Sequence, residues 1–249
     1  MAGLLAAYCL CFSPPLKAAV TVETFTDYNA FLKLLGSQAQ VVNFDDVPTL
    51  PLDPSSPSYR YGYFDSGRYA NQGILIRAET GAQAVWSLPS VGAVSPPNVY
   101  SAALGAAPFP PTFREVSELS FTRAGAPALT SGFGTFFINN YEAFGPGTGS
   151  VSFMEAYGAD GSLLVRGDPA TTAPNGSTFL GFATVDSSSG ALVPAIDQIQ
   201  VIAGLHDLVD VYLDNFTFAT PVPEGNAWAL LVATALAVVG MYRRRVAAA

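Results

Sequence analysis

Two apolar segments joined by a tight turn decide the fold of this chain: Val151-Ser-Phe-Met-Glu-Ala-Tyr157, then Asp160-Gly161, then Leu163-Leu-Val165. Asp-Gly suits the positive φ angles of a tight hairpin turn, and the flanking segments are rich in residues that favour extended structure. The pattern predicts a β-hairpin whose strands span Ser150–Tyr157 and Ser162–Arg166.

Similar segments recur along most of the chain. Runs rich in Val, Ile, Phe, Tyr and Thr alternate with turn residues such as Gly, Pro, Asn and Asp. Two Pro-rich regions, 48–57 and 95–111, are expected to be long connections rather than central strands, because Pro lacks a backbone donor. Strands without helical crossovers predict a mainly β fold, an antiparallel β-sandwich of the jelly-roll type. The other expected strands are Val41–Phe44, Gly73–Ala78, Ala84–Ser87, Glu118–Thr122, Gly132–Ile138, Thr178–Thr184, Gln198–Ile202 and Val209–Ala219.

One short N-terminal helix is expected before these strands. Thr26 is the expected N-cap, and Asp27 suits the positive N-terminal end of the helix. Gly36 is expected to end it. The apolar residues recur at helical spacing, namely Tyr28, Phe31, Leu32 and Leu35.

The two ends of the chain carry the signals of export. Residues 1–19 form an apolar leader, which we expect to be a signal peptide, and residues 20–219 form the folded body. At about 1.5 Å per residue the apolar run 227–242 spans about 24 Å, less than a hydrocarbon core of about 30 Å. This short C-terminal transmembrane helix therefore suits a removable stop signal, the alternative being a permanent anchor. The C-terminal tail, 222–249, also holds the motif Val222, Pro223, Glu224 and the basic stop Arg243, Arg244, Arg245.

This tail resembles the bacterial PEP-CTERM sorting domain, which is processed by a membrane protease called exosortase. The usual motif is Val-Pro-Glu-Pro, and Gly225 replaces the second Pro. The resemblance implies an exported protein that is held transiently at the inner membrane. It is then released to the cell surface or the extracellular matrix.

The body is similar to a frequent class of PEP-CTERM passenger domain, which looks like a carbohydrate-binding jelly roll. The shared motifs include Thr24-Phe-Thr-Asp27, Asn43-Phe-Asp-Asp46 and Leu213-Asp-Asn-Phe216. The resemblance covers roughly residues 22–219. It implies a non-enzymatic biofilm protein that associates with exopolysaccharide.

The charge of the chain disfavours anionic partners. The full chain carries 19 acidic and 11 basic groups. Loss of Lys17 with the leader, and of Glu224 and the three terminal Arg with the tail, leaves 18 acidic and 7 basic groups. A body of that charge repels nucleic acid and anionic lipid.

Three carboxylates are candidate metal ligands. Apolar residues alternate on one face of the last strand up to Leu213, and the apolar phase then shifts to Phe216, which predicts a β-bulge near Asp214. In carbohydrate-binding jelly rolls, a structural Ca²⁺ joins carboxylates of the first strand to one of the last strand. By that resemblance Asp45, Asp46 and Asp214 are the candidate ligands, and the alternative is a hydrogen-bonded strand end without metal.

An aromatic cluster is the candidate sugar contact. Tyr rings can stack on sugar rings and donate hydrogen bonds through their hydroxyls. The alternative is a strand whose Tyr side chains are core residues. The candidate residues are Tyr59, Tyr61, Tyr63 and Tyr69, with Phe64, Arg60 and Arg68 beside them.

The residues give little support for an enzyme. His206 is the only histidine, so a His-rich zinc site is excluded, and no Gly-x-Ser-x-Gly elbow is present. Candidate acids for glycoside hydrolysis are Glu115, Glu118, Glu142 and Glu155, but their spacing selects no pair. We therefore expect no enzymatic activity. A carbohydrate-binding module with a defined sugar ligand is the first alternative, and a glycoside-active enzyme is the second.

Overall fold

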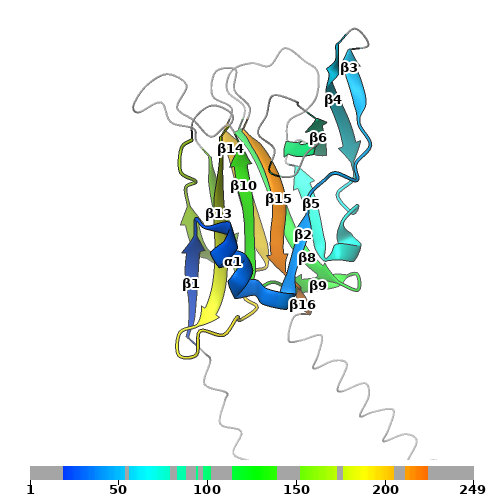
Figure 1. Cartoon of the computed structure of the whole chain (residues 1–249). Helices are drawn as coiled ribbons and strands as arrows, with labels where there is room; N and C mark the ends of the chain where they lie inside the picture. The colour runs from blue at the N-terminus through cyan, green and yellow to red at the C-terminus, as the bar shows by residue number, and fades with distance from the viewer. Residues whose placement is uncertain are drawn as a thin grey trace, which may run out of the picture.

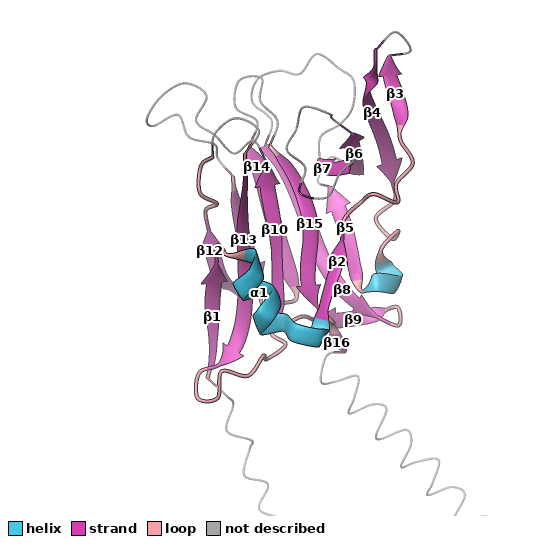
Figure 2. Ribbon diagram, in the orientation of Figure 1, coloured by secondary structure: helices cyan, strands magenta, loops and turns pink. Residues whose placement is uncertain are grey.

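The fold is seen in a computed structural model, which describes residues 19–53, 56–78, 83–87, 94, 98–101, 114–138, 152–172, 176–204 and 211–223. It confirms a mainly β fold in which two antiparallel sheets pack as a sandwich, with one α-helix on the outside (Figures 1 and 2). The leader and the expected C-terminal helix over 227–242 lie outside the described residues.

The first sheet has nine strands, and its centre is formed by β13, β10 and β15. Strand β2 also pairs with β15 and completes the sheet beside this path. In order across the sheet the strands are β1 (Val20–Phe25), β13 (Ser177–Asp186), β10 (Gly132–Ile138), β15 (Tyr212–Ala219), β7 (Asn98–Ser101), β6 (Gln83–Ser87), β4 (Ser56–Phe64) and β3 (Leu50–Asp53), with β2 at Ala39–Val42.

The second sheet has seven strands and lies against one face of the first. Strand β8 is its longest member and pairs with β14, β9 and β5. In order the strands are β12 (Leu163–Gly167), β11 (Phe153–Tyr157), β14 (Gln198–Gly204), β8 (Arg114–Arg123), β9 (Ala126–Leu129) and β16 (Val222–Pro223), with β5 (Ile74–Ala78) on β8.

The main hydrophobic core fills the space between the sheets. Phe133 and Phe216 from the first sheet and Leu119 and Ile199 from the second are all fully buried in one cluster. Burial of large apolar side chains is the dominant favourable contribution to folding. In the second sheet, apolar residues at alternate positions of β5 and β8 face this space, whereas β10 and β15 of the first sheet are buried along nearly their whole length.

Helix α1 (Tyr28–Leu35) covers the other face of the first sheet, and the one-turn 3₁₀ helix η1 (Gly36–Gln38) follows it. Phe31 and Leu35 pack there against Phe179 of β13. The N-cap is Asp27 rather than the expected Thr26, because the Asp27 carboxylate accepts hydrogen bonds from the backbone of the first helical turn. The helix ends at Gly36 as expected, where φ is +55°.

The predicted hairpin and bulge are both present. Asp160-Gly161 connects β11 to β12, with φ of +75° at Gly161. The pairing of β10 with β15 shifts by one residue between Asp214 and Thr217, and φ at Asn215 is +52°. The first turn needs a residue that tolerates positive φ, and the bulge re-aims the side chains of the last long strand.

The prediction for one Pro-rich region is wrong. Strand β7 lies in the region 95–111 and pairs with both β15 and β6, so it is an interior strand. It begins directly after Pro97, so no Pro interrupts its ladder. In the other region, β3 contains Pro51 but lies at the edge of its sheet, where a missing donor is tolerated.

The start of β1 and strand β16 lie at the same end of the sandwich, whereas the β3–β4 hairpin projects from the opposite end (Figure 1). The segments that lead to the two chain termini therefore leave the described body at one end. Within the described residues no helix is long and apolar enough to cross a membrane.

Candidate functional site

The β3–β4 hairpin carries the first half of the predicted aromatic cluster. Strand β4 pairs with β3 on one side and with β6 on the other. Leu50 lies opposite Tyr61, and Tyr63 lies two residues further along β4, so these three residues share one side of the hairpin. We call these residues the hairpin face.

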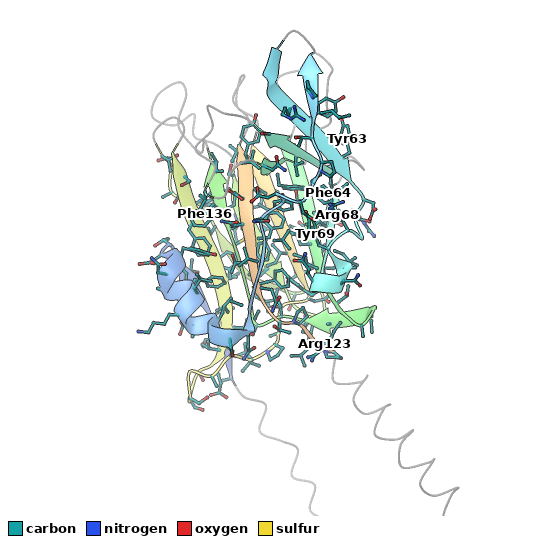
Figure 3. All side chains as sticks on the ribbon, turned by 45° about the vertical axis from the view of Figure 1, so that its right-hand side comes forward. Tyr63, Phe64, Arg68, Tyr69, Arg123 and Phe136 are labelled. Atoms are coloured by element: carbon teal, nitrogen blue, oxygen red, sulfur yellow. The ribbon has the colours of Figure 1, made fainter. Side chains whose placement is uncertain are left out.

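Two of the three side chains of the hairpin face are open to solvent. Tyr63 is 52% exposed and Leu50 is 68% exposed, while Tyr61 is partly buried. The rings of Tyr61 and Tyr63 meet edge to face with centroids 5.5 Å apart. Figure 3 shows Tyr63 on the projecting hairpin, above the packed core. These two contacting rings and the exposed Leu50 form an apolar platform, and each ring carries a phenolic hydroxyl.

The opposite side of the hairpin is closed by the chain itself. A Cβ atom at Gly62 would lie 2.2 Å from the carbonyl oxygen of Pro48, so only glycine allows this close approach. Arg60 donates to the hydroxyl and carbonyl oxygens of Thr49 at 3.1 and 2.6 Å. These contacts hold β4 against residues 48–49 and leave the hairpin face as the open side.

Tyr69, from the second half of the cluster, is a core residue. Its side chain is 3% exposed and packs against Phe44 and Phe64, with ring centroids 5.7 and 5.6 Å away. Its hydroxyl donates to Asp46 Oδ1 at 2.6 Å. Burial, followed by this hydrogen bond, raises the pKa of Tyr69. Tyr69 therefore cannot stack on a sugar, and that part of the prediction is wrong.

Asp46 and Arg68 join this buried ring to the surface. Arg68 Nη2 lies 3.1 Å from Asp46 Oδ2 and also donates to the Asp46 backbone oxygen at 2.7 Å. One carboxylate thus holds a tyrosine hydroxyl and a guanidinium. The side chain of Tyr59 lies outside the described residues, although its backbone belongs to β4.

Asp45 and Asp46, two of the three candidate metal ligands, accept hydrogen bonds from other residues of the chain. Asp45 Oδ2 accepts from the Asn43 amide at 2.9 Å, and Asp45 Oδ1 accepts from the Asn98 backbone at 3.3 Å. The pKa of Asp45 is raised above its ordinary value, mainly because the carboxyl is partly buried. The hydrogen bond from the Asn98 N–H opposes this rise, and the nearby charge of Asp46 adds to it. Asp46 is engaged by Tyr69 and Arg68.

Asp214, the third candidate, is fully buried in the bulge of β15. Its Oδ2 accepts from the backbone of Val94 at 2.8 Å, and its Oδ1 accepts from the backbone of Asn215 at 2.8 Å. Backbone N–H groups thus stabilise this carboxylate. The described residues contain no group of three or more His, Cys, Asp or Glu that could hold a metal ion, so Asp45, Asp46 and Asp214 are not brought together.

The predicted sorting motif begins inside the folded body. Val222 lies opposite Leu129, and Pro223 lies opposite Ala128, so both belong to the edge strand β16. Arg123 lies at this end of the sandwich (Figure 3). Its Nη1 donates to the backbone oxygen of Pro221 at 3.3 Å, and the residue borders a hollow of about 440 Å³. Glu224, Arg243, Arg244 and Arg245 lie outside the described residues.

The candidate acids for hydrolysis are placed only in part. Glu118 of β8 and Glu155 of β11 lie in one row of the second sheet, with Gln200 of β14 between them. Glu155 accepts from the Tyr157 hydroxyl at 2.6 Å and pairs with Arg166 at 3.5 Å. Glu142 and His206 lie outside the described residues, as does the side chain of Glu115.

Sequence reasoning missed the rest of this row, which also contains Arg77 and Arg166. The signal was present as polar residues two apart, Glu118 with Ser120 and Gln198 with Gln200. The register that aligns them across strands is not readable from spacing within one strand.

Comparison of the chain with protein-family models, with curated proteins and with solved structures found no match.

Proposed function

We propose that this chain is an exported, non-enzymatic protein of the bacterial cell surface or extracellular matrix that associates with exopolysaccharide. The observation that carries this is the hairpin face, where Tyr61, Tyr63 and Leu50 present an open apolar platform. Aromatic rings of this kind are suited to stack on the apolar faces of sugar rings. The sandwich is, in this proposal, of the jelly-roll type.

The position of the platform fits a surface protein. The hairpin projects from the end of the sandwich opposite to β16, after which the sorting motif continues (Figure 1). A body held at a membrane by its C-terminal tail would then direct the hairpin face outwards. The acidic composition keeps such a body soluble and away from anionic lipid.

The association with polysaccharide is tested by co-sedimentation. The full-length chain in mild detergent is mixed with exopolysaccharide isolated from a bacterium that makes an exosortase. We expect the chain to sediment with the polymer and to be released when the polymer is enzymatically degraded. A chain that stays in the supernatant contradicts the proposed association.

A carbohydrate-binding module with one defined sugar ligand is the alternative favoured by the same rings. A glycan array separates it from the first proposal. Strong binding to a single oligosaccharide class favours the module, whereas weak binding to many long chains favours a matrix protein.

The tail is, in this proposal, a sorting signal removed by an exosortase-type protease after a transient stay in the inner membrane. Expression in a host with exosortase should give a product without Arg243, Arg244 and Arg245, as measured by mass spectrometry of the intact protein. Recovery of only the full-length chain, in a host shown to process its own substrates, contradicts this part of the proposal.

The position of the motif predicts that processing needs local opening of β16. Val222 and Leu129 are directly opposite residues of an antiparallel pair, at a separation that a disulfide can bridge. The double variant Val222→Cys, Leu129→Cys should be trimmed much more slowly than the single variant Val222→Cys, and reduction should restore the rate. Equal rates for the oxidised double variant and its single-cysteine control would show that β16 stays paired during cleavage.

A further inference from the structure

Five polar side chains form a continuous row across five strands of the second sheet. Direct pairing places Arg77 opposite Glu118, Glu118 opposite Gln200, Gln200 opposite Glu155, and Glu155 opposite Arg166. Directly opposite residues point to the same face of a sheet. We call this row the polar ladder; at about 4.8 Å between strands it spans about 19 Å.

The ladder lies on the outer face of its sheet. The neighbouring row, one residue along each strand, is apolar and faces the core, with Ile76, Leu119, Ile199 and Ala156 all fully buried. Among the ladder residues, Arg77 and Arg166 are exposed and the other three are partly buried. Alternation along the strands therefore puts charged and amide groups on the open side.

One end of the ladder is held rigidly. The guanidinium of Arg166 lies 3.6 Å from the ring centroid of Phe153 and pairs with Glu155 at 3.5 Å and Asp168 at 3.8 Å. Tyr157 lies two residues further along β11, on the same face, and donates its hydroxyl to Glu155 at 2.6 Å. Groups fixed before binding lose less conformational entropy when a ligand arrives.

The other end of the ladder is hollowed. A depression of about 160 Å³ opens between β5, β8 and β14. Its lining combines polar residues, which can donate and accept hydrogen bonds, with two leucines, and a sugar ring offers groups that suit both. The lining residues are Ser66, Leu75, Arg77, Glu118, Leu119, Ser120 and Gln198.

We propose that the polar ladder binds a neutral polysaccharide chain, laid across the strands from the hollow at β5 towards Tyr157 and Arg166. The ladder contains two guanidinium groups, two carboxylates and an amide, so it has no net charge of its own. A polyanion would meet Glu118, Glu155 and an acidic body, and a polycation would meet Arg77 and Arg166. An uncharged chain of hydroxyls can donate to the carboxylates and accept from the guanidinium and amide groups.

This inference rests on the proposed association with polysaccharide and adds the ligand class and a second surface. It does not involve the hairpin face or the tail. The competing explanation is that the Arg–Glu pairs only stabilise the sheet by cross-strand attraction.

The test is affinity electrophoresis of the full-length chain in mild detergent through gels that contain a defined polymer. The neutral probes are hydroxyethylcellulose, dextran and galactomannan, and the matched polyanion is carboxymethylcellulose, which shares its backbone with the first probe. We expect retardation by at least one neutral polymer and little retardation by carboxymethylcellulose.

Variants then locate the site. The double variant Gln198→Ala, Gln200→Ala should weaken retardation by roughly tenfold, because two amides that can hydrogen-bond the ligand are removed. Gln72→Ala, at an exposed glutamine in the 3₁₀ helix η2 (Ala70–Gln72), is the control and should leave retardation unchanged. Thermal unfolding of each variant checks that the fold is intact.

Three results would overturn the inference: no retardation by any neutral polymer, equal retardation by carboxymethylcellulose, or unchanged retardation of a folded double variant. The third result would leave the ladder as a stabilising row. Failure of all three neutral probes, with the native exopolysaccharide still bound in the co-sedimentation assay, would remove the neutral-ligand inference and keep the proposed function.

Discussion

The two halves of one tyrosine-rich segment have opposite environments. Tyr61 and Tyr63 lie on a hairpin that projects beyond the sandwich, whereas Tyr69, six residues after Tyr63, is buried between the sheets. The turn 65–68 redirects the chain from the hairpin into the core. Closeness in sequence therefore does not give tyrosines a common role: the first two are available to a ligand and the third stabilises the fold.

The largest expected effect is a difference in the free energy of unfolding between variants of the two halves. Tyr69→Ala removes a buried ring that packs against Phe44 and Phe64, and we expect a loss of about 3–5 kcal/mol in the free energy of unfolding. Tyr63→Ala should change it by about 0.5 kcal/mol or less, because its ring is half exposed. Chemical denaturation measures both values, and similar losses for the two variants would contradict the division.

Gly62→Ala is expected to disturb the hairpin from its closed side. The added Cβ would collide with the carbonyl oxygen of Pro48, so β4 must move away from residues 48–49. Overpacking of this kind costs about 1–3 kcal/mol. The variant should bind exopolysaccharide more weakly although both tyrosines are still present, as measured by co-sedimentation. Unchanged binding would show that the ring positions do not depend on this contact.

Tyr69→Phe tests the hydrogen bond without removing the ring. The hydroxyl donates to the Asp46 carboxylate at 2.6 Å, and the loss of one such bond should cost about 1–2 kcal/mol. The control is Tyr63→Phe, whose expected effect on unfolding is close to zero because the residue is exposed. A stable Tyr69→Phe variant would mean that the ring alone determines the contribution of Tyr69.

The smallest expected effect depends on alkaline pH. The pKa of Tyr69 is raised by burial and by the bond to Asp46, above an ordinary value of about 10. The unfolded chain ionises this tyrosine first, so its contribution to stability is complete below about pH 10 and is lost as the pH rises further. Between about pH 9 and pH 11 the wild type should lose more stability than Tyr69→Phe. Parallel pH profiles would contradict the assigned shift.

Elements with a local signal could be predicted from the sequence. Strand β10 matches its expected range Gly132–Ile138, and Asp160-Gly161 forms the expected turn because its conformation depends only on neighbouring residues. Strands β4 and β7 were not predicted, because β4 contains a Pro and β7 directly follows one. Both strands are stabilised by pairing with other strands of the sheet. Propensity within one strand cannot report such pairing.

From the sequence, the candidate site could be recognised only as a segment enriched in tyrosine. The excess of tyrosine marked residues 59–69 as a candidate sugar contact, but the sequence could not tell the exposed Tyr63 from the buried Tyr69, because burial depends on where the chain turns. The bulge at Asp214 was predictable from the change of apolar phase, whereas its backbone partner at Val94 lies 120 residues away. The polar ladder depends on the register of five strands, which no single strand encodes.

The most direct test of the central claim is co-sedimentation of the double variant Tyr61→Ala, Tyr63→Ala with isolated exopolysaccharide, alongside its thermal unfolding. The account predicts strongly reduced sedimentation with an unfolding temperature close to that of the wild type, because the two rings contribute to binding rather than to the core. Full sedimentation of the folded double variant would contradict the claim that the hairpin face binds polysaccharide.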